Sequence, residues 1–122
     1  MPHRPKVLVV ESGLEYQRLC EEAGLGKKAK LFFASTLAEA HQLFNEHRAN
    51  LALILVAALM EKSEQPNTVP FVLACRERGF AGPIIAWSNA PGYRQPLVAA
   101  GCTHEADKLA GPTLVLKLLG LS

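Results

Sequence analysis

The segment that decides the fold runs from Leu51 to Val56, reads LALILV and contains no polar residue. A second run of the same kind, VLVV, spans Val7 to Val10. A strand with one side in solvent alternates apolar and polar residues, whereas a strand covered on both sides is apolar throughout. The two segments therefore predict buried strands of a parallel sheet, with helices on both of its faces.

Helix and strand signals alternate along the rest of the chain. Ser12 with Glu15, and Thr36 with Glu39, have the S/T-x-x-E spacing of a capping box, so a helix is expected to begin at each place. The first helix is expected to end at Gly24, and further strands are expected at 30–34, 83–87 and 102–106. Three more helix boundaries are expected: a helix that ends at Gly79, a helix that has Pro96 in its first turn and ends at Gly101, and a last helix that begins at Pro112. This alternation predicts five strands and five helices in a doubly wound α/β sheet.

Composition favours one soluble domain spanning residues 1–122. The chain is 49% hydrophobic and 20% charged, and its formal net charge of +2 is far from the basic balance of a typical nucleic-acid-binding domain. The three cysteines form no C-x-x-C pair, which suits a reducing compartment. The apolar run near the amino end is too short for a signal peptide or a membrane span. We therefore expect a cytoplasmic protein with no membrane association.

The common catalytic and cofactor motifs are missing from the sequence. Asp107 is the single aspartate, and the segment GLGKKAK (residues 24–30) lacks the glycines and the Ser or Thr of a phosphate-binding loop. The four histidines show no metal-ligand spacing, and there is no G-x-S-x-G elbow. We therefore expect no enzymatic activity, no cofactor and no metal. The basic turn of Lys27, Lys28 and Lys30 leaves nucleic-acid contact as an alternative to a solvated turn.

Polar residues are expected where the strands end. In open α/β sheets, ligands and chemistry lie at the carboxyl ends of the strands. Three sequence segments place residues there: KVLVVES from Lys6, PIIAWSN from Pro83, and AAGCTHEADK ending at Lys108. In this order and spacing around LALILV, the chain resembles the receiver domain of bacterial response regulators, the CheY-like family, over nearly its whole length. The resemblance implies a flavodoxin-like sheet with strand order 2-1-3-4-5.

The resemblance also implies a phosphorylation pocket. In the family, two adjacent acids hold Mg²⁺, an aspartate at the tip of the third strand accepts phosphate, and a Ser or Thr and a Lys contact the phosphoryl group. The corresponding positions here are Glu11, Ser12, Leu55 or Val56, Ser88 and Lys108. An aliphatic residue thus replaces the acceptor, and one of the two acids is lost. The chain is therefore interpreted as a degenerate pseudo-receiver that forms no acyl phosphate.

Lys108 requires a partner if it lies in a partly buried cleft, because a buried ammonium is costly unless it is paired or deprotonated; the alternative is a side chain that extends into solvent. We expect an ion pair between Glu11 and Lys108, joined by Ser88, that fixes one conformation in place of a phosphate switch.

The function expected from a retained scaffold without its chemistry is protein–protein contact in signalling. The resemblance and the leucine-rich last helix favour a surface formed by the fourth helix, the fifth strand and the last helix, occupied by a partner protein or a second copy of the chain. The expected contact residues are Tyr93, Arg94, Leu97, Leu116 and Leu121. The alternatives are a nucleic-acid-associated adaptor that uses the basic turn, a receiver with unusual phosphorylation at Glu11 or elsewhere, and a flavin carrier, which the single Ser and Gly of SGLEY disfavour.

Overall fold

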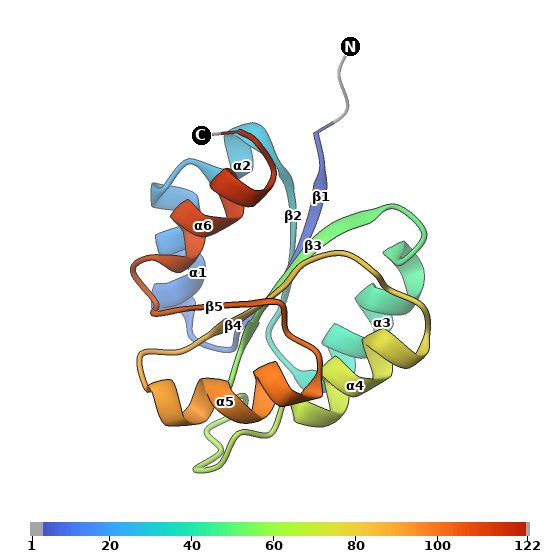
Figure 1. The fold of residues 1–122 in the computed structure, drawn as a ribbon. Helices are drawn as coiled ribbons and strands as arrows, with labels where there is room; N and C mark the ends of the chain where they lie inside the picture. Colours follow the sequence, from blue (N-terminus) through green and yellow to red (C-terminus); the bar gives the residue numbers. More distant parts are fainter. Residues whose placement is uncertain (1–3, 122) are drawn as a thin grey trace.

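The central element is a parallel sheet. The computed structural model describes residues 4–121 and contains five strands in the order β2-β1-β3-β4-β5, as expected (Figure 1). The strands are β1 (Lys6–Val10), β2 (Lys30–Ala34), β3 (Leu51–Ala57), β4 (Ile84–Trp87) and β5 (His104–Ala106). The sheet pairs β1 with both β2 and β3, so the order of strands reverses at β1, where sheets of this class place their sites.

Helices cover both faces of the sheet, as the sequence predicts (Figure 1). They are α1 (Leu14–Glu22), α2 (Leu25–Lys28), α3 (Leu37–His47), α4 (Val69–Glu77), α5 (Pro91–Ala100) and α6 (Gly111–Leu118). One hydrophobic core joins α3, α4 and α5 to the sheet, and a second core joins α1, α2 and α6 to its other face. Within residues 4–121, no helix is both long and apolar enough to cross a membrane.

The apolar run of β3 is explained by these two cores. Ile54 and Val56 are fully buried in the first core, and Leu53 and Leu55 are fully buried in the second. Successive strand residues point to opposite faces, so a central strand covered on both sides has no position for a polar residue.

Three local predictions are wrong. The structure has a sixth helix, the one-turn α2, because Leu25 is drawn fully into the second core after the left-handed Gly24. Ser12 caps nothing; Gly13 stands at the start of α1. Pro96 lies inside α5 rather than in its first turn, because the helix begins at Pro91. Because proline has no backbone N–H, the carbonyl of Gly92 receives no hydrogen bond from Pro96 within the helix. Both residues are exposed, so water can bond this carbonyl instead.

Strand register brings the expected site residues to one edge. Val10 pairs with Val56, and Trp87 pairs with both Ala57 and Ala106. The residues that follow these strands, including Glu11 and Ser88, therefore leave the sheet together at its carboxyl end.

Candidate functional site

A cavity of about 290 Å³ lies at the carboxyl end of the sheet. Glu11 reaches it from the end of β1, Ser88 from the end of β4, and Lys108 from the turn after β5. The other lining residues are Tyr16, Ala58, Leu59, Trp87, Asn89, Ala90 and Tyr93. The topology thus gathers residues that are 97 positions apart in the sequence, Glu11 and Lys108, around one opening.

Glu11 and Lys108 form a buried ion pair. The Lys108 Nζ donates to Glu11 Oε1, and the two side chains are only 12% and 5% exposed, respectively. The other carboxylate oxygen of Glu11 accepts a hydrogen bond from the Gly13 backbone nitrogen at 3.0 Å. The pair expected from the sequence is therefore present, and both oxygens of its carboxylate have a donor.

Two aromatic rings enclose the ammonium. Lys108 Nζ lies 4.2 Å from the ring centroid of Trp87 and 4.4 Å from that of Tyr16, distances typical of cation–π contacts. Trp87 also donates from Nε1 to the Lys108 carbonyl at 3.1 Å. Gly111 leaves room for this ring, since a Cβ there would lie 2.4 Å from Trp87 Nε1. Trp87 thus contacts Lys108 at both its side-chain ammonium and its backbone carbonyl.

The backbone around Lys108 is fixed by Asn89. Its Oδ1 accepts a hydrogen bond from the Lys108 backbone nitrogen at 2.8 Å, which ties the turn after β5 to the turn after β4. This hydrogen bond and the one from Trp87 fix the backbone of Lys108 on both sides, and its side chain is thereby oriented into the cavity.

Burial controls the protonation of Lys108. Loss of hydration lowers the pKa of Lys108 below its ordinary value of 10.5, while the attraction and hydrogen bond of Glu11 act in the opposite direction. Glu11 therefore offsets part of the lowering of the Lys108 pKa by burial.

Ser88 does not join the ion pair, contrary to expectation. Its hydroxyl accepts a hydrogen bond from the Ala90 backbone nitrogen at 3.2 Å, and its carbonyl accepts one from Arg94 at 2.8 Å. Ser88 lines the cavity, but the hydroxyl is used at the start of α5, because a serine at a strand end readily bonds the backbone two residues on.

Leu55 and Val56 do not occupy the pocket position expected of them. Both are fully buried and neither lines the cavity. β3 extends to Ala57, one residue further than expected, so the chain reaches the cavity at Ala58 and Leu59. The sequence from 50 to 60 contains no acid, and this shift of register brings none into the cavity.

Ser12 also lies elsewhere. Its hydroxyl accepts a hydrogen bond from the Glu61 backbone nitrogen at 3.3 Å, which links the turn after β1 to the loop after β3. Ser12 is not among the residues that line the cavity.

The residues present do not fit the Mg²⁺ that the resemblance implies. Mg²⁺ needs several oxygen ligands, of which one or two are carboxylates. Here Glu11 is the only carboxylate among the described lining residues, and a lysine ammonium already takes one of its oxygens. Within residues 4–121, no group of three or more His, Cys, Asp or Glu side chains could hold a metal ion.

The expected contact surface is partly corrected. Tyr93 is 36% exposed, and Arg94 bridges to Glu105 at 2.9 Å, so both lie on the surface formed by α5 and β5. Leu97 is fully buried, because it is on the side of α5 that packs against the sheet. It cannot contact a partner while that helix stays in place.

The last helix exposes less apolar surface than expected. Leu116 and Leu121 are half-buried, and neither is among the large exposed hydrophobic residues, which are Leu14, Leu73, Tyr93, Val98 and Leu109. α6 lies beside α1 and α2 (Figure 1), and most of its leucines pack on the second core. The unforeseen α2 adds Leu25 to the same core on which these leucines pack.

Sequence reasoning missed Tyr16 and Trp87 as site residues. The sequence pattern places Trp87 in the strand at 83–87 and gives Tyr16 no role in the site. The available signal was position: Trp87 is the last residue of a strand whose next residue is Ser88, and Tyr16 lies in the first turn of the helix that follows β1. Aromatic residues at such positions can close over a nearby cation.

No protein-family model matches the chain, and no curated protein matches it in sequence. Several solved structures match nearly its whole length. The chemotaxis response regulator CheY4 of Vibrio cholerae is 22% identical, with a TM-score of 0.75, over 95% of this chain and 96% of that one. A mutant receiver domain of the histidine kinase CKI1 from Arabidopsis thaliana is 16% identical, with a TM-score of 0.74, over 98% and 92%.

An orphan response regulator of H. pylori is also similar. It is 17% identical, with a TM-score of 0.74, over 97% of this chain and 99% of that chain. At these identities, the three comparisons show that the chain has the fold of response-regulator receiver domains.

Proposed function

We propose that this chain is a degenerate receiver that acts in signalling by protein contact and independently of phosphorylation. The observation that carries the proposal is the Glu11–Lys108 ion pair, closed over by Trp87 and Tyr16. A lysine charge that would otherwise attract a phosphoryl group is already neutralised within the protein.

The cavity also offers no free carboxylate for an acyl phosphate. The loop after β3 contributes Ala58 and Leu59, which have no oxygen nucleophile. The carboxylate of Glu11 already accepts a hydrogen bond at each oxygen, one of them within the buried charge pair, so attack on a phosphodonor would compete with these contacts. The pair thus supports a domain held in one state, with no chemical step in its function.

The surface proposed for contact is formed by α5, β5 and α6. Exposed Tyr93 and Val98 give it apolar area, and the Arg94–Glu105 bridge gives it a charged rim. Aromatic and arginine residues are enriched among those that dominate binding energy at interfaces. A partner protein or a second copy of the chain is the proposed occupant.

Phosphorylation is tested by intact-mass measurement after incubation with acetyl phosphate and Mg²⁺. We expect no phosphoryl increment on the wild-type chain, while an aspartate-bearing receiver domain treated in parallel shows one. An increment that disappears in Glu11→Gln would contradict the proposal and identify the acceptor.

Contact is tested by quantitative recovery of partners from native extract on immobilised protein, together with light scattering of the purified chain. We expect Tyr93→Ala to lose the recovered partner or the dimer. Leu73→Ala, which removes an exposed apolar side chain from α4, serves as the matched control and should retain it. Equal recovery by both variants would reject this surface.

A further inference from the structure

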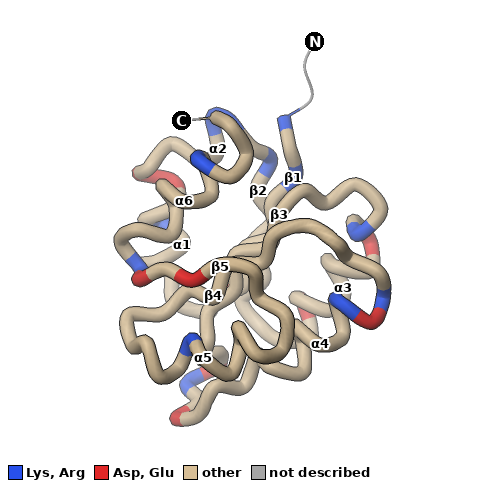
Figure 2. The backbone as a smooth tube through the Cα atoms, in the orientation of Figure 1, with Lys and Arg blue, Asp and Glu red and all other residues tan. Residues whose placement is uncertain are grey.

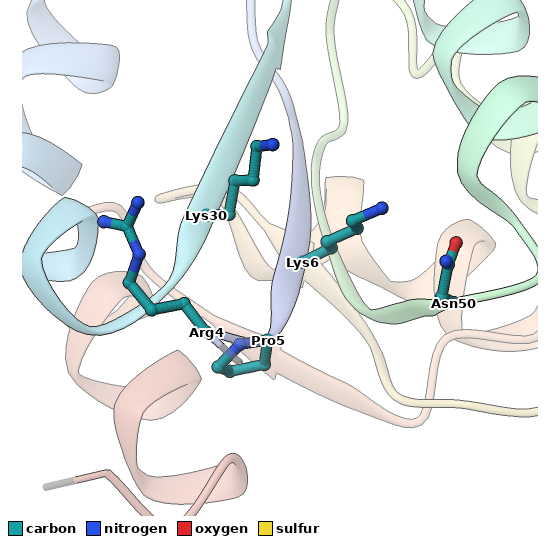
Figure 3. Close-up of a pocket in the computed structure, with 5 residues that line it drawn as sticks. All are labelled: Arg4, Pro5, Lys6, Lys30 and Asn50. Atoms are coloured by element: carbon teal, nitrogen blue, oxygen red, sulfur yellow. The ribbon is translucent and has the colours of Figure 1, made fainter. Parts of the chain in front are cut away.

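A second cavity, of about 550 Å³, lies at the opposite, amino end of the sheet. It is lined by Arg4, Pro5, Lys6, Lys30 and Asn50 (Figure 3). Three of these five residues are cations and none is an acid. The volume is within the range of about 300–1,000 Å³ that is typical of small-molecule sites.

No described acid forms an ion pair with the cations of this cavity. Lys6 and Lys30 are register partners on the adjacent parallel strands β1 and β2, so both lysines stand at the amino end of the sheet. The ion pairs found within residues 4–121 involve other side chains: His47 with Glu46, Arg94 with Glu105, and Lys108 with Glu11. A bound anion would therefore meet positive charges that no described acid neutralises.

Local backbone irregularity coincides with this cavity. The register between β1 and β3 shifts between Lys6 and Val7, so that Ala52 has no direct partner. Such bulges redirect side chains and are frequent beside functional sites. Figure 3 shows the Lys6 ammonium directed toward Asn50 and the Arg4 guanidinium extending to the other side, with Lys30 between them.

The spacing of these cations indicates which kind of anion the cavity can bind. Cations that spread along an opening suit a ligand with several negative groups in a row rather than a single ion. Figure 2 shows Lys or Arg positions on α2 as well as at the starts of β1 and β2, and α2 contains Lys27 and Lys28. Arg4 donates a hydrogen bond to the carbonyl of Gly26 in that helix at 2.8 Å. None of the described residues that line the cavity is aromatic, so these side chains offer no ring on which a nucleic-acid base would stack.

We propose that this cavity binds a short chain of phosphate groups, as found in inorganic tripolyphosphate or in the triphosphate of a nucleotide. Arg4 supplies a planar donor fork, Lys6 and Lys30 supply point charges, and the Asn50 amide supplies a neutral donor. The site is at the other end of the sheet from the Glu11–Lys108 pair, so it does not depend on the function proposed above.

The test is isothermal titration of the full chain with sodium tripolyphosphate, at low and at physiological salt. We expect saturable 1:1 binding that weakens as salt increases. Lys30→Gln should weaken it about tenfold, as expected for the loss of one charge-assisted contact. Lys62→Gln removes one exposed lysine from the loop after β3, at the far end, and should leave binding unchanged.

Parallel titrations with ATP, orthophosphate and a single-stranded oligonucleotide identify the source of the phosphates. Binding of tripolyphosphate and ATP with similar affinity, above that of orthophosphate, supports recognition of the phosphate chain alone. Tripolyphosphate binding without ATP binding assigns the inorganic ligand.

Three results would overturn the proposal: no binding of tripolyphosphate, equal weakening by Lys30→Gln and Lys62→Gln, or binding of the oligonucleotide alone. Trp87 fluorescence checks that each variant is folded. If Lys30→Gln is not folded, Arg4→Gln replaces it with the same expected result, since Arg4 is exposed.

Discussion

Lys108 illustrates at the residue scale how a buried charge is retained. Removing its ammonium from water costs free energy, and the contacts with Glu11 and with two aromatic ring faces offset that cost. Breaking such a pair by removing one member leaves the other charge buried alone, whereas removing both members avoids that cost.

We expect Lys108→Met to lower the free energy of unfolding by about 3–5 kcal/mol, because Glu11 then remains buried without its counter-ion. The double variant Glu11→Gln/Lys108→Met should regain most of this loss, since the glutamine still accepts from Gly13. Urea unfolding at pH 7, followed by fluorescence of Trp87, measures both. A loss below about 1 kcal/mol in the single variant would mean that the pair behaves like an exposed one.

At the element scale, two S/T-x-x-E motifs of identical spacing, at Thr36 and at Ser12, form different hydrogen bonds. Thr36 caps α3: its hydroxyl accepts from the Glu39 backbone nitrogen at 3.1 Å, and Glu39 accepts in return from Ser35 at 3.2 Å. Ser12, by contrast, makes its bond with the loop after β3, and α1 begins after Gly13. The same S/T-x-x-E pattern therefore provides a side-chain helix cap in one place only.

We expect Thr36→Ala to destabilise the protein by about 1 kcal/mol, the usual cost of a lost amino-terminal cap. Ser12→Ala is the matched control and should cost about 0.5 kcal/mol or less, because its 3.3 Å bond is long and partly exposed. Thermal unfolding of the two variants side by side compares them. Equal shifts would show that Ser12 contributes a cap after all.

At the scale of the whole molecule, the three cysteines limit the stability of the fold at alkaline pH. Burial raises the pKa of Cys20, Cys75 and Cys102 from 9.0 to about 12 in each case. Thiols that ionise later in the folded state than in the unfolded state stabilise the fold fully below pH 9, and that contribution is lost as pH rises toward 12. Lys108, whose pKa is lowered, changes stability in the opposite direction, but it is one group against three.

We expect the free energy of unfolding to fall steeply between pH 9 and 12, by about 1.4 kcal/mol per pH unit for each thiol. For a domain with a total stability of about 5–15 kcal/mol, this leads to alkaline unfolding. Urea titrations from pH 8 to 11 measure the slope, and Cys102→Ala should reduce it by one thiol's share. The slope rather than the absolute stability is compared, because the substitution also leaves a small cavity. An unchanged slope would mean that this thiol is not protected by burial.

Much of the architecture could be predicted from sequence because it depends on local pattern. The apolar runs at 7–10 and 51–56, the strand at 30–34 and the cap at Thr36 each follow from side chains close together in the chain, and all appear in the structure. The Glu11–Lys108 pair could also be predicted, because parallel strands bring their carboxyl ends to one edge.

Tertiary structure alone decided the features that depend on partners far away in the sequence. The rings over Lys108, the separate role of Ser88, the burial of Leu97 and the existence of α2 all arise from packing between elements. Periodicity records which side of an element is apolar, but it does not record which other element covers that side or how far a strand extends before it turns. Those outcomes are set by the competition of many contacts in the folded chain, in which a local preference such as that of Ser12 for a helix cap is one small contribution.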